Sequence, residues 1–138
     1  MADPLLLSSA ALFVTATAYA TAVAATETDL PGEPFGLLVP GPVRTHLALG
    51  LGSAISAPLL MPAIATWAAV RGAPGSDWAA RTVAILGAGL LIGTLAEPVT
   101  WGRRPASALA RSSIPLHLAV GAAMVATGTH RLRQQADR

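Results

Sequence analysis

The chain places one acidic side chain at the end of an apolar stretch, where a carboxyl group is costly to bury. Glu97 follows the apolar residues 78–96 and directly precedes Pro98. The residue before a proline is pushed out of helical geometry, so we expect Glu97 at a helix end, facing a cavity. Partial desolvation there would raise its pKa, which suits proton transfer near neutral pH. We therefore predict that Glu97 is a catalytic acid or base.

Two histidines are predicted to lie at the same depth as this carboxyl group. His46 begins the apolar stretch of residues 45–70, and His117 lies about one turn inside that of residues 113–129. Histidine exchanges protons near neutral pH, so we predict His117 or His46 as the catalytic partner of Glu97. The alternative is an ordinary hydrogen bond from each ring to a backbone carbonyl. The three groups lack close ligand spacing, and no metal is predicted.

Further residues at this end are predicted to contact a substrate. Arginines there would orient a polar head or stabilise developing negative charge, and adjacent arginines are suited to clamping a phosphate or carboxylate. The alternatives are an ion pair of Glu97 with Arg44 or Arg103, and contacts of the arginines with lipid headgroups. The predicted substrate-binding residues are Arg44, Arg103, Arg104, Tyr19, Trp101 and Glu27.

Four long apolar stretches must position these side chains. Of the 138 residues, 53% are hydrophobic and only 12% are charged. Residues 47–70 carry no charge, whereas a soluble alanine-rich bundle would show charges every turn or two. A helix of about 20 residues crosses the hydrocarbon core of about 30 Å. We predict one all-α domain over residues 1–138, an integral membrane four-helix up-down bundle with spans at about 5–25, 45–70, 78–97 and 113–129.

Local signals refine these boundaries. Asp3 followed by Pro4 is typical of a helix start, Ser76 is the expected cap of the third span, and Ser112 or Ser113 that of the fourth. Pro58 and Pro62 predict a kink within the second span. The proline- and glycine-rich residues 26–43 exclude regular helix, and the apolar residues 35–39 are expected to fold back or to lie in the membrane interface.

Two further patterns concern assembly and orientation. Gly89 and Gly93 have the spacing that lets helix backbones approach closely, either within the bundle or in a homo-oligomer. Arginine counts at the two ends weakly favour a cell membrane protein with both termini in the cytoplasm. The compared sets are Arg71, Arg81, Arg131, Arg133 and Arg138 against Arg44, Arg103, Arg104 and Arg111, with acidic residues such as Asp29 beside the second set.

These observations favour a small membrane enzyme. It would perform cofactor-independent acid/base chemistry, such as isomerisation, cyclisation or epoxide opening, on a lipophilic substrate in a polar pocket near one membrane face. The sequence has no cysteine and no phosphate-binding motif, so no cofactor is predicted, and it has no basic stripe that would indicate nucleic acid. The expected partners are the lipid bilayer and a lipophilic small molecule. The alternative is a non-catalytic membrane module, such as a dimeric proton-coupled exporter or an assembly subunit.

Overall fold

The computed structural model describes residues 2–27 and 30–137, so Asp29 and Arg138 of the charge comparison lie outside the described residues. The described chain is 71% helical and contains no strand. Its elements are α1 (Pro4–Ala24), η1 (Pro34–Gly36), α2 (Val43–Ala48), α3 (Leu60–Arg71), α4 (Asp77–Ala96), η2 (Pro98–Trp101) and α5 (Ala108–Ala136). The all-helical prediction is confirmed for this part of the chain.

Three of these helices, α1, α4 and α5, are long and apolar enough to cross a membrane. They are consistent with a multi-pass membrane protein. Asp3 caps α1 as predicted, because its carboxylate accepts hydrogen bonds from the backbone N–H groups of Leu5 and Leu6. The predicted cap of α5 was wrong: Ser107 caps this helix, its Oγ lying 3.0 Å from the Ala110 nitrogen.

The second predicted span is broken in the structure. A single kinked helix over residues 45–70 was expected, but α2 ends at Ala48 and α3 begins at Leu60. Gly50 and Gly52 have φ angles of 71° and 83°, in the left-handed region that favours glycine. A Cβ atom at Gly52 would also collide with the backbone of Ser56. The intervening residues therefore form a folded loop, and α3 alone, at roughly 1.5 Å per residue, is too short to cross the bilayer.

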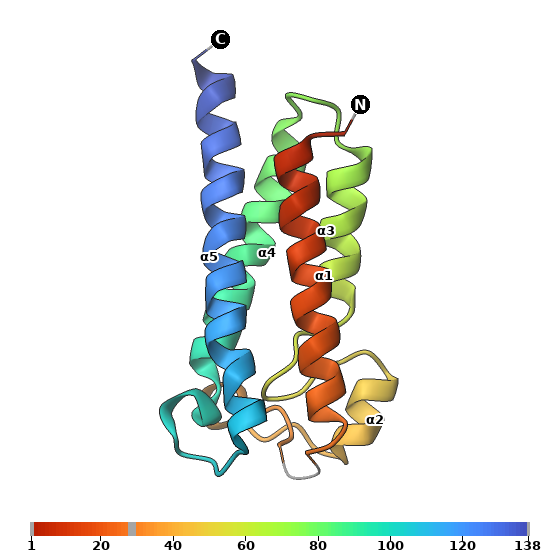
Figure 1. Cartoon of the computed structure of the whole chain (residues 1–138), viewed down its shortest axis with the longest axis vertical. Coiled ribbons are helices and arrows are strands. Elements are labelled where there is room, and N and C mark those ends of the chain that lie inside the picture. Colours follow the sequence, from red (N-terminus) through yellow and green to blue (C-terminus); the bar gives the residue numbers. More distant parts are fainter. Residues whose placement is uncertain (1, 28–29, 138) are drawn as a thin grey trace.

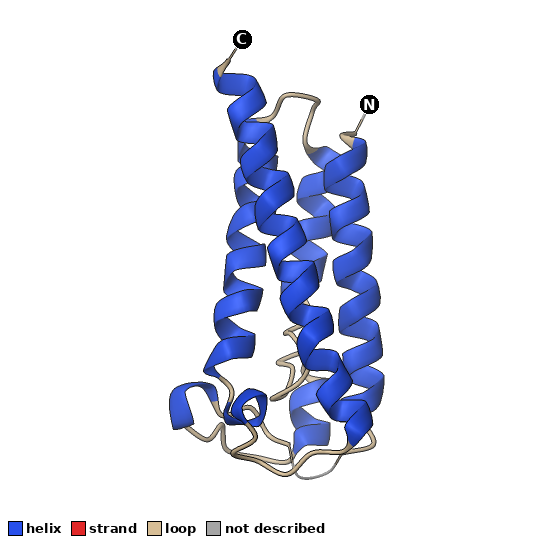
Figure 2. Ribbon diagram, turned by 60° about the vertical axis from the view of Figure 1, so that its left-hand side comes forward, coloured by secondary structure: helices blue, strands red, loops and turns tan. Residues whose placement is uncertain are grey.

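The long helices pack side by side (Figure 1), and their buried apolar side chains belong to two clusters. Both ends of the chain lie at one end of the molecule, and α2 and η2 lie at the other. Phe13, Val83 and Met124 are fully buried and belong to one apolar cluster contributed mainly by α1, α3, α4 and α5. Most of its members lie in the half of the molecule near the termini. Loop backbone lies among the helices in the opposite half (Figure 2).

Glycines bring α4 and α5 into close contact. A Cβ atom on Gly87 would lie 2.6 Å from the Met124 Cβ and 2.8 Å from the Gly121 carbonyl oxygen. A Cβ on Gly128 would lie 2.7 Å from the Ala84 Cβ. Close backbone approach is a main source of helix association in lipid, where the hydrophobic effect contributes little. These glycines, rather than the predicted Gly89 and Gly93 pair, form the tight helix contact.

Candidate functional site

A cavity of about 210 Å³ lies in the half of the molecule that holds α2. Its walls come from α2, α3, α4, α5, the loop between α2 and α3, and the segment around η1. For scale, an engineered apolar cavity of about 150 Å³ holds a benzene molecule. Most of the lining is apolar, with side chains that include Leu51, Ile55, Met61, Leu90 and Ile114.

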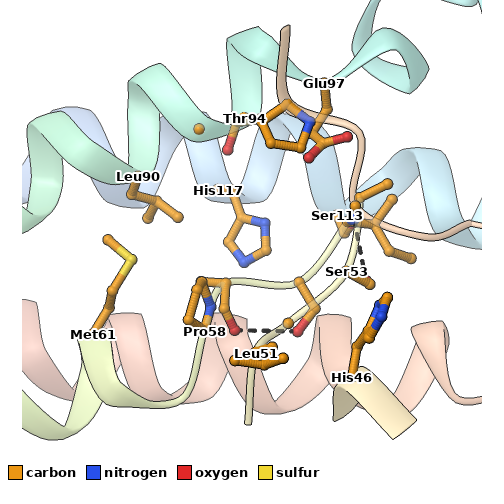
Figure 3. Close-up of a pocket in the computed structure, with 18 of the residues that line it drawn as sticks. His46, Leu51, Ser53, Pro58, Met61, Leu90, Thr94, Glu97, Ser113 and His117 are labelled. Carbon is orange, nitrogen blue, oxygen red and sulfur yellow. Dashed lines mark hydrogen bonds between the residues drawn. The ribbon is translucent and has the colours of Figure 1, made fainter. Parts of the chain in front are cut away.

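Glu97 lies at the edge of this cavity, directly after the last residue of α4. Its ψ angle of 130° confirms the helix end predicted from Pro98. The side chain is only 8% exposed. Its two carboxylate oxygens accept from the backbone N–H of Glu33, at N···O distances of 2.9 and 3.2 Å. The carboxyl group is thus fixed between the end of α4 and the segment that precedes η1, and it faces the cavity (Figure 3).

Burial raises the pKa of Glu97 above its ordinary value of 4.5. The hydrogen bond from the Glu33 backbone acts in the opposite direction, and the negative charge of the Glu33 side chain raises the pKa further. Arg104 pairs with that Glu33 side chain at 2.7 Å. Among the described residues Glu97 itself forms no ion pair, so the alternative of a bridge to Arg44 or Arg103 is not what the structure shows. Glu97 therefore retains more of its proton than an exposed glutamate.

We expect Glu33→Gln to lower the pKa of Glu97, because the substitution removes a neighbouring negative charge and keeps the backbone hydrogen bond. The carboxyl stretch of Glu97, assigned in infrared spectra by its loss in Glu97→Gln, should then disappear at lower pH than in the wild type. Arg104→Gln is the matched comparison. It leaves the Glu33 charge unpaired and should move the titration of Glu97 to higher pH. Shifts in the same direction, or no shift in either variant, would contradict this electrostatic account.

His117 brings a second titratable group to the same cavity. It lies on α5 and is 3% exposed, and its Nε2 atom is buried without any hydrogen-bond partner. Figure 3 shows its ring within the cavity, with the Glu97 carboxyl group directed into the same space. Leaving a buried polar atom unpaired costs about 1–3 kcal/mol. A ligand with a hydrogen-bonding group would recover this cost.

His46 also lines the cavity, from α2, but it already has a partner. The side chain is 4% exposed, and its Nε2 atom lies 2.8 Å from the Pro40 carbonyl oxygen. For His46 the structure therefore shows the alternative to a catalytic role, an ordinary hydrogen bond between the ring and a backbone carbonyl. Among the described residues no group of three His, Cys, Asp or Glu side chains is placed to hold a metal ion.

The six residues predicted to bind substrate lie outside the cavity. They differ in their exposure and in their hydrogen-bond partners. Tyr19 bonds through its hydroxyl to Ser112 at 2.7 Å, and the exposed Trp101 donates from its indole nitrogen to the Leu95 carbonyl at 2.8 Å. Glu27 is half-buried beyond the end of α1. The exposed arginines are Arg44 on α2 and Arg103 and Arg104 after η2, of which Arg104 reaches Glu97 only through Glu33.

Sequence reasoning missed the loop that forms one wall of the cavity. Residues 51–58 all line it, and Ser53 and Ser56 pair there through their backbones. The polar side chains of Thr94 and Ser113 were also missed. The glycines at 50 and 52, so close to Pro58, were the available signal, since together they disfavour a continuous helix.

Comparison of the chain with known protein families, with curated proteins and with solved structures finds no match.

Proposed function

We propose that this chain is an integral membrane enzyme that performs acid/base chemistry on a lipophilic substrate held in the cavity. The observation that carries this proposal is one largely apolar cavity that contains both the buried carboxyl group of Glu97, whose pKa burial raises, and the unpartnered Nε2 of His117. Pairs of titratable groups in different environments are the usual basis of acid and base roles. Apolar walls suit a substrate drawn from the bilayer.

In the proposed membrane arrangement the chain crosses four times, as an up-down bundle. Helices α1, α4 and α5 each form a crossing, and α2, the loop and α3 together form the second. Irregular backbone is tolerated at membrane depth where it lines a cavity or is buried in protein. The loop of residues 49–59 meets this condition, because most of it lines the cavity.

The proposed chemistry moves protons only. Protonated Glu97 donates its proton to the substrate, at a double bond for isomerisation or cyclisation, or at the oxygen of an epoxide. His117 Nε2, directly or through a hydroxyl group hydrogen-bonded to it, accepts the proton that is released in exchange: from a second carbon in isomerisation or cyclisation, or from the water that attacks a protonated epoxide. Proton exchange with solvent then returns Glu97 to its protonated state and His117 to its neutral state. His46, held by Pro40, supports the cavity wall near this pair.

The broken second crossing is the one observation that favours the alternative, a proton-coupled exporter, because transporters often build sites from discontinuous helices. A transport path must reach both membrane faces. In one copy of this chain, fully buried apolar side chains that include Phe13, Val83 and Met124 lie beyond the cavity, and the groove between α1 and α3 shares no lining residue with it. The enzyme is therefore the better-supported proposal.

The test uses the protein in vesicles made from the lipid extract of the producing cells, with deuterated water as solvent. Isomerisation or cyclisation would leave a solvent-derived deuterium on a product carbon. Hydrolytic epoxide opening would add heavy oxygen in a parallel sample prepared in oxygen-18 water. Mass spectrometry should detect a labelled lipophilic product that requires the wild-type protein and is lost in Glu97→Gln. If the label is the same with protein-free vesicles, the proposed enzyme activity is wrong.

A further inference from the structure

We propose that the cavity takes a neutral lipophilic molecule that ends in one hydroxyl group, and that this molecule enters sideways from the bilayer between α3 and α4. The inference rests on the proposed function in taking the cavity as the substrate site. It adds the access route and the chemical class of the ligand.

The opening lies where α4 presents glycines instead of side chains. Gly89 and Gly93 line the cavity and are also exposed on the outer face of α4. A Cβ atom on Gly93 would meet nothing within 4 Å, and one on Gly89 would meet only the methyl group of Met61, at 3.5 Å. Met61 lies at the start of α3 and is half-buried. The wall between the two helices therefore consists of two glycines and one flexible side chain.

The surroundings of this opening are suited to lipid. Large apolar side chains on the outer faces of α3 and α4 are exposed near it, including Leu60, Ile64, Ile85 and Ile92. At the end of the molecule that holds α2, the cavity is covered by Gly32, Pro34 and Val39. A hydrogen bond from the Val39 N–H to the Gly32 carbonyl joins the two ends of this covering segment. The path between α3 and α4 is therefore the open one, and a ligand that uses it comes from the bilayer.

The polar groups of the cavity indicate which polar end group the ligand carries. The described residues that line it include no arginine, so a phosphate or carboxylate would meet Glu97 without a compensating cation. Among the described residues that line the cavity, His117 Nε2 is the buried side-chain polar atom that lacks a partner, and the ring is 3% exposed. A hydroxyl group can donate to or accept from an imidazole nitrogen, so it satisfies either tautomer. A neutral alcohol with an apolar chain or ring thus matches both the lining and the unpaired atom.

The experiment is photolabelling of the full-length protein in phosphatidylcholine vesicles. The probe is a long-chain alcohol carrying a diazirine close to its hydroxyl group, and the comparison probe is the matching alkane without the hydroxyl. We expect the alcohol to label the peptides around Met61 and His117. Gly93→Phe places a ring in the opening and should reduce this labelling at least about ten-fold, whereas Ala11→Phe, on the exposed face of α1, should leave it within about two-fold.

Two results would overturn the inference. Unchanged labelling in Gly93→Phe would exclude the opening between α3 and α4, and equal labelling by the alkane would exclude recognition of the hydroxyl by His117. Circular dichroism of Gly93→Phe checks that the helices are intact, and the milder Gly89→Leu repeats the test at the second glycine. Labelling measures binding alone. Specific labelling without any labelled turnover product would leave the access route standing and reject the enzyme.

Discussion

Glu97→Gln is expected to abolish the solvent-derived label while leaving the fold intact. A positioned acid or base contributes about 100- to 10,000-fold to a rate, so product formation should fall at least about 100-fold. Glutamine has nearly the same shape and keeps an oxygen that accepts from the Glu33 backbone N–H, but its amide has no acidic proton to transfer to a substrate. Label formation is measured by mass spectrometry at several pH values.

The matched control for this variant is a second acidic residue that takes no part in the site. Asp77 lies at the far end of α4 in an exposed pair with Arg81, at 3.6 Å. Asp77→Asn removes the same kind of charge from the same helix, and label formation should persist. Turnover that survives in a folded Glu97→Gln protein would remove Glu97 from the catalytic role.

Gly87→Ala is expected to destabilise the bundle by about 1–3 kcal/mol, the usual cost of overpacking a tight contact. The new methyl group would lie 2.6 Å from the Met124 Cβ and 2.8 Å from the Gly121 carbonyl oxygen. Because a Cβ atom and a backbone oxygen cannot move independently of their helix, α4 and α5 must separate. The loss is measured as the free energy of unfolding in mixed detergent micelles, followed by circular dichroism.

Gly93→Ala, six residues further along the same helix, gives the matched comparison. Its methyl group meets nothing within 4 Å, so alanine should be neutral or should stabilise α4 by up to about 1 kcal/mol through its higher helix propensity. Opposite signs for the two substitutions are expected only if Gly87 faces α5 and Gly93 faces the cavity. Equal destabilisation would contradict this placement.

The sequence predicted the helices well where apolar runs were uninterrupted. Helices α1 and α4 begin and end within about two residues of expectation, because length and hydrophobicity define a membrane span directly. Asp3 was identifiable as a cap from its position before Pro4. The prediction of one helix over residues 45–70 was wrong, because the apolar composition of these residues suits a continuous helix and a buried loop equally.

The candidate site was predictable only in part. The proline after Glu97 placed this carboxyl group at a helix end, and antiparallel connections placed His117 on the same side. Which side chains face inward depends on the rotation of each helix about its axis. That rotation is set by packing at Gly87, Gly121 and Gly128, and residue types alone do not give it. The exposed arginines were therefore assigned to a site that they do not line.

The most direct test of the shared cavity is nuclear magnetic resonance of the protein in lipid nanodiscs. Carboxyl-labelled glutamate and ring-labelled histidine are incorporated, and the Glu97 and His117 signals are assigned by Glu97→Gln and His117→Phe. Adding the long-chain alcohol should shift both the Glu97 carboxyl carbon and the His117 Nε2 signal, because both groups line one cavity. If neither signal shifts, or if only one responds at saturating alcohol, the two groups do not share a ligand site.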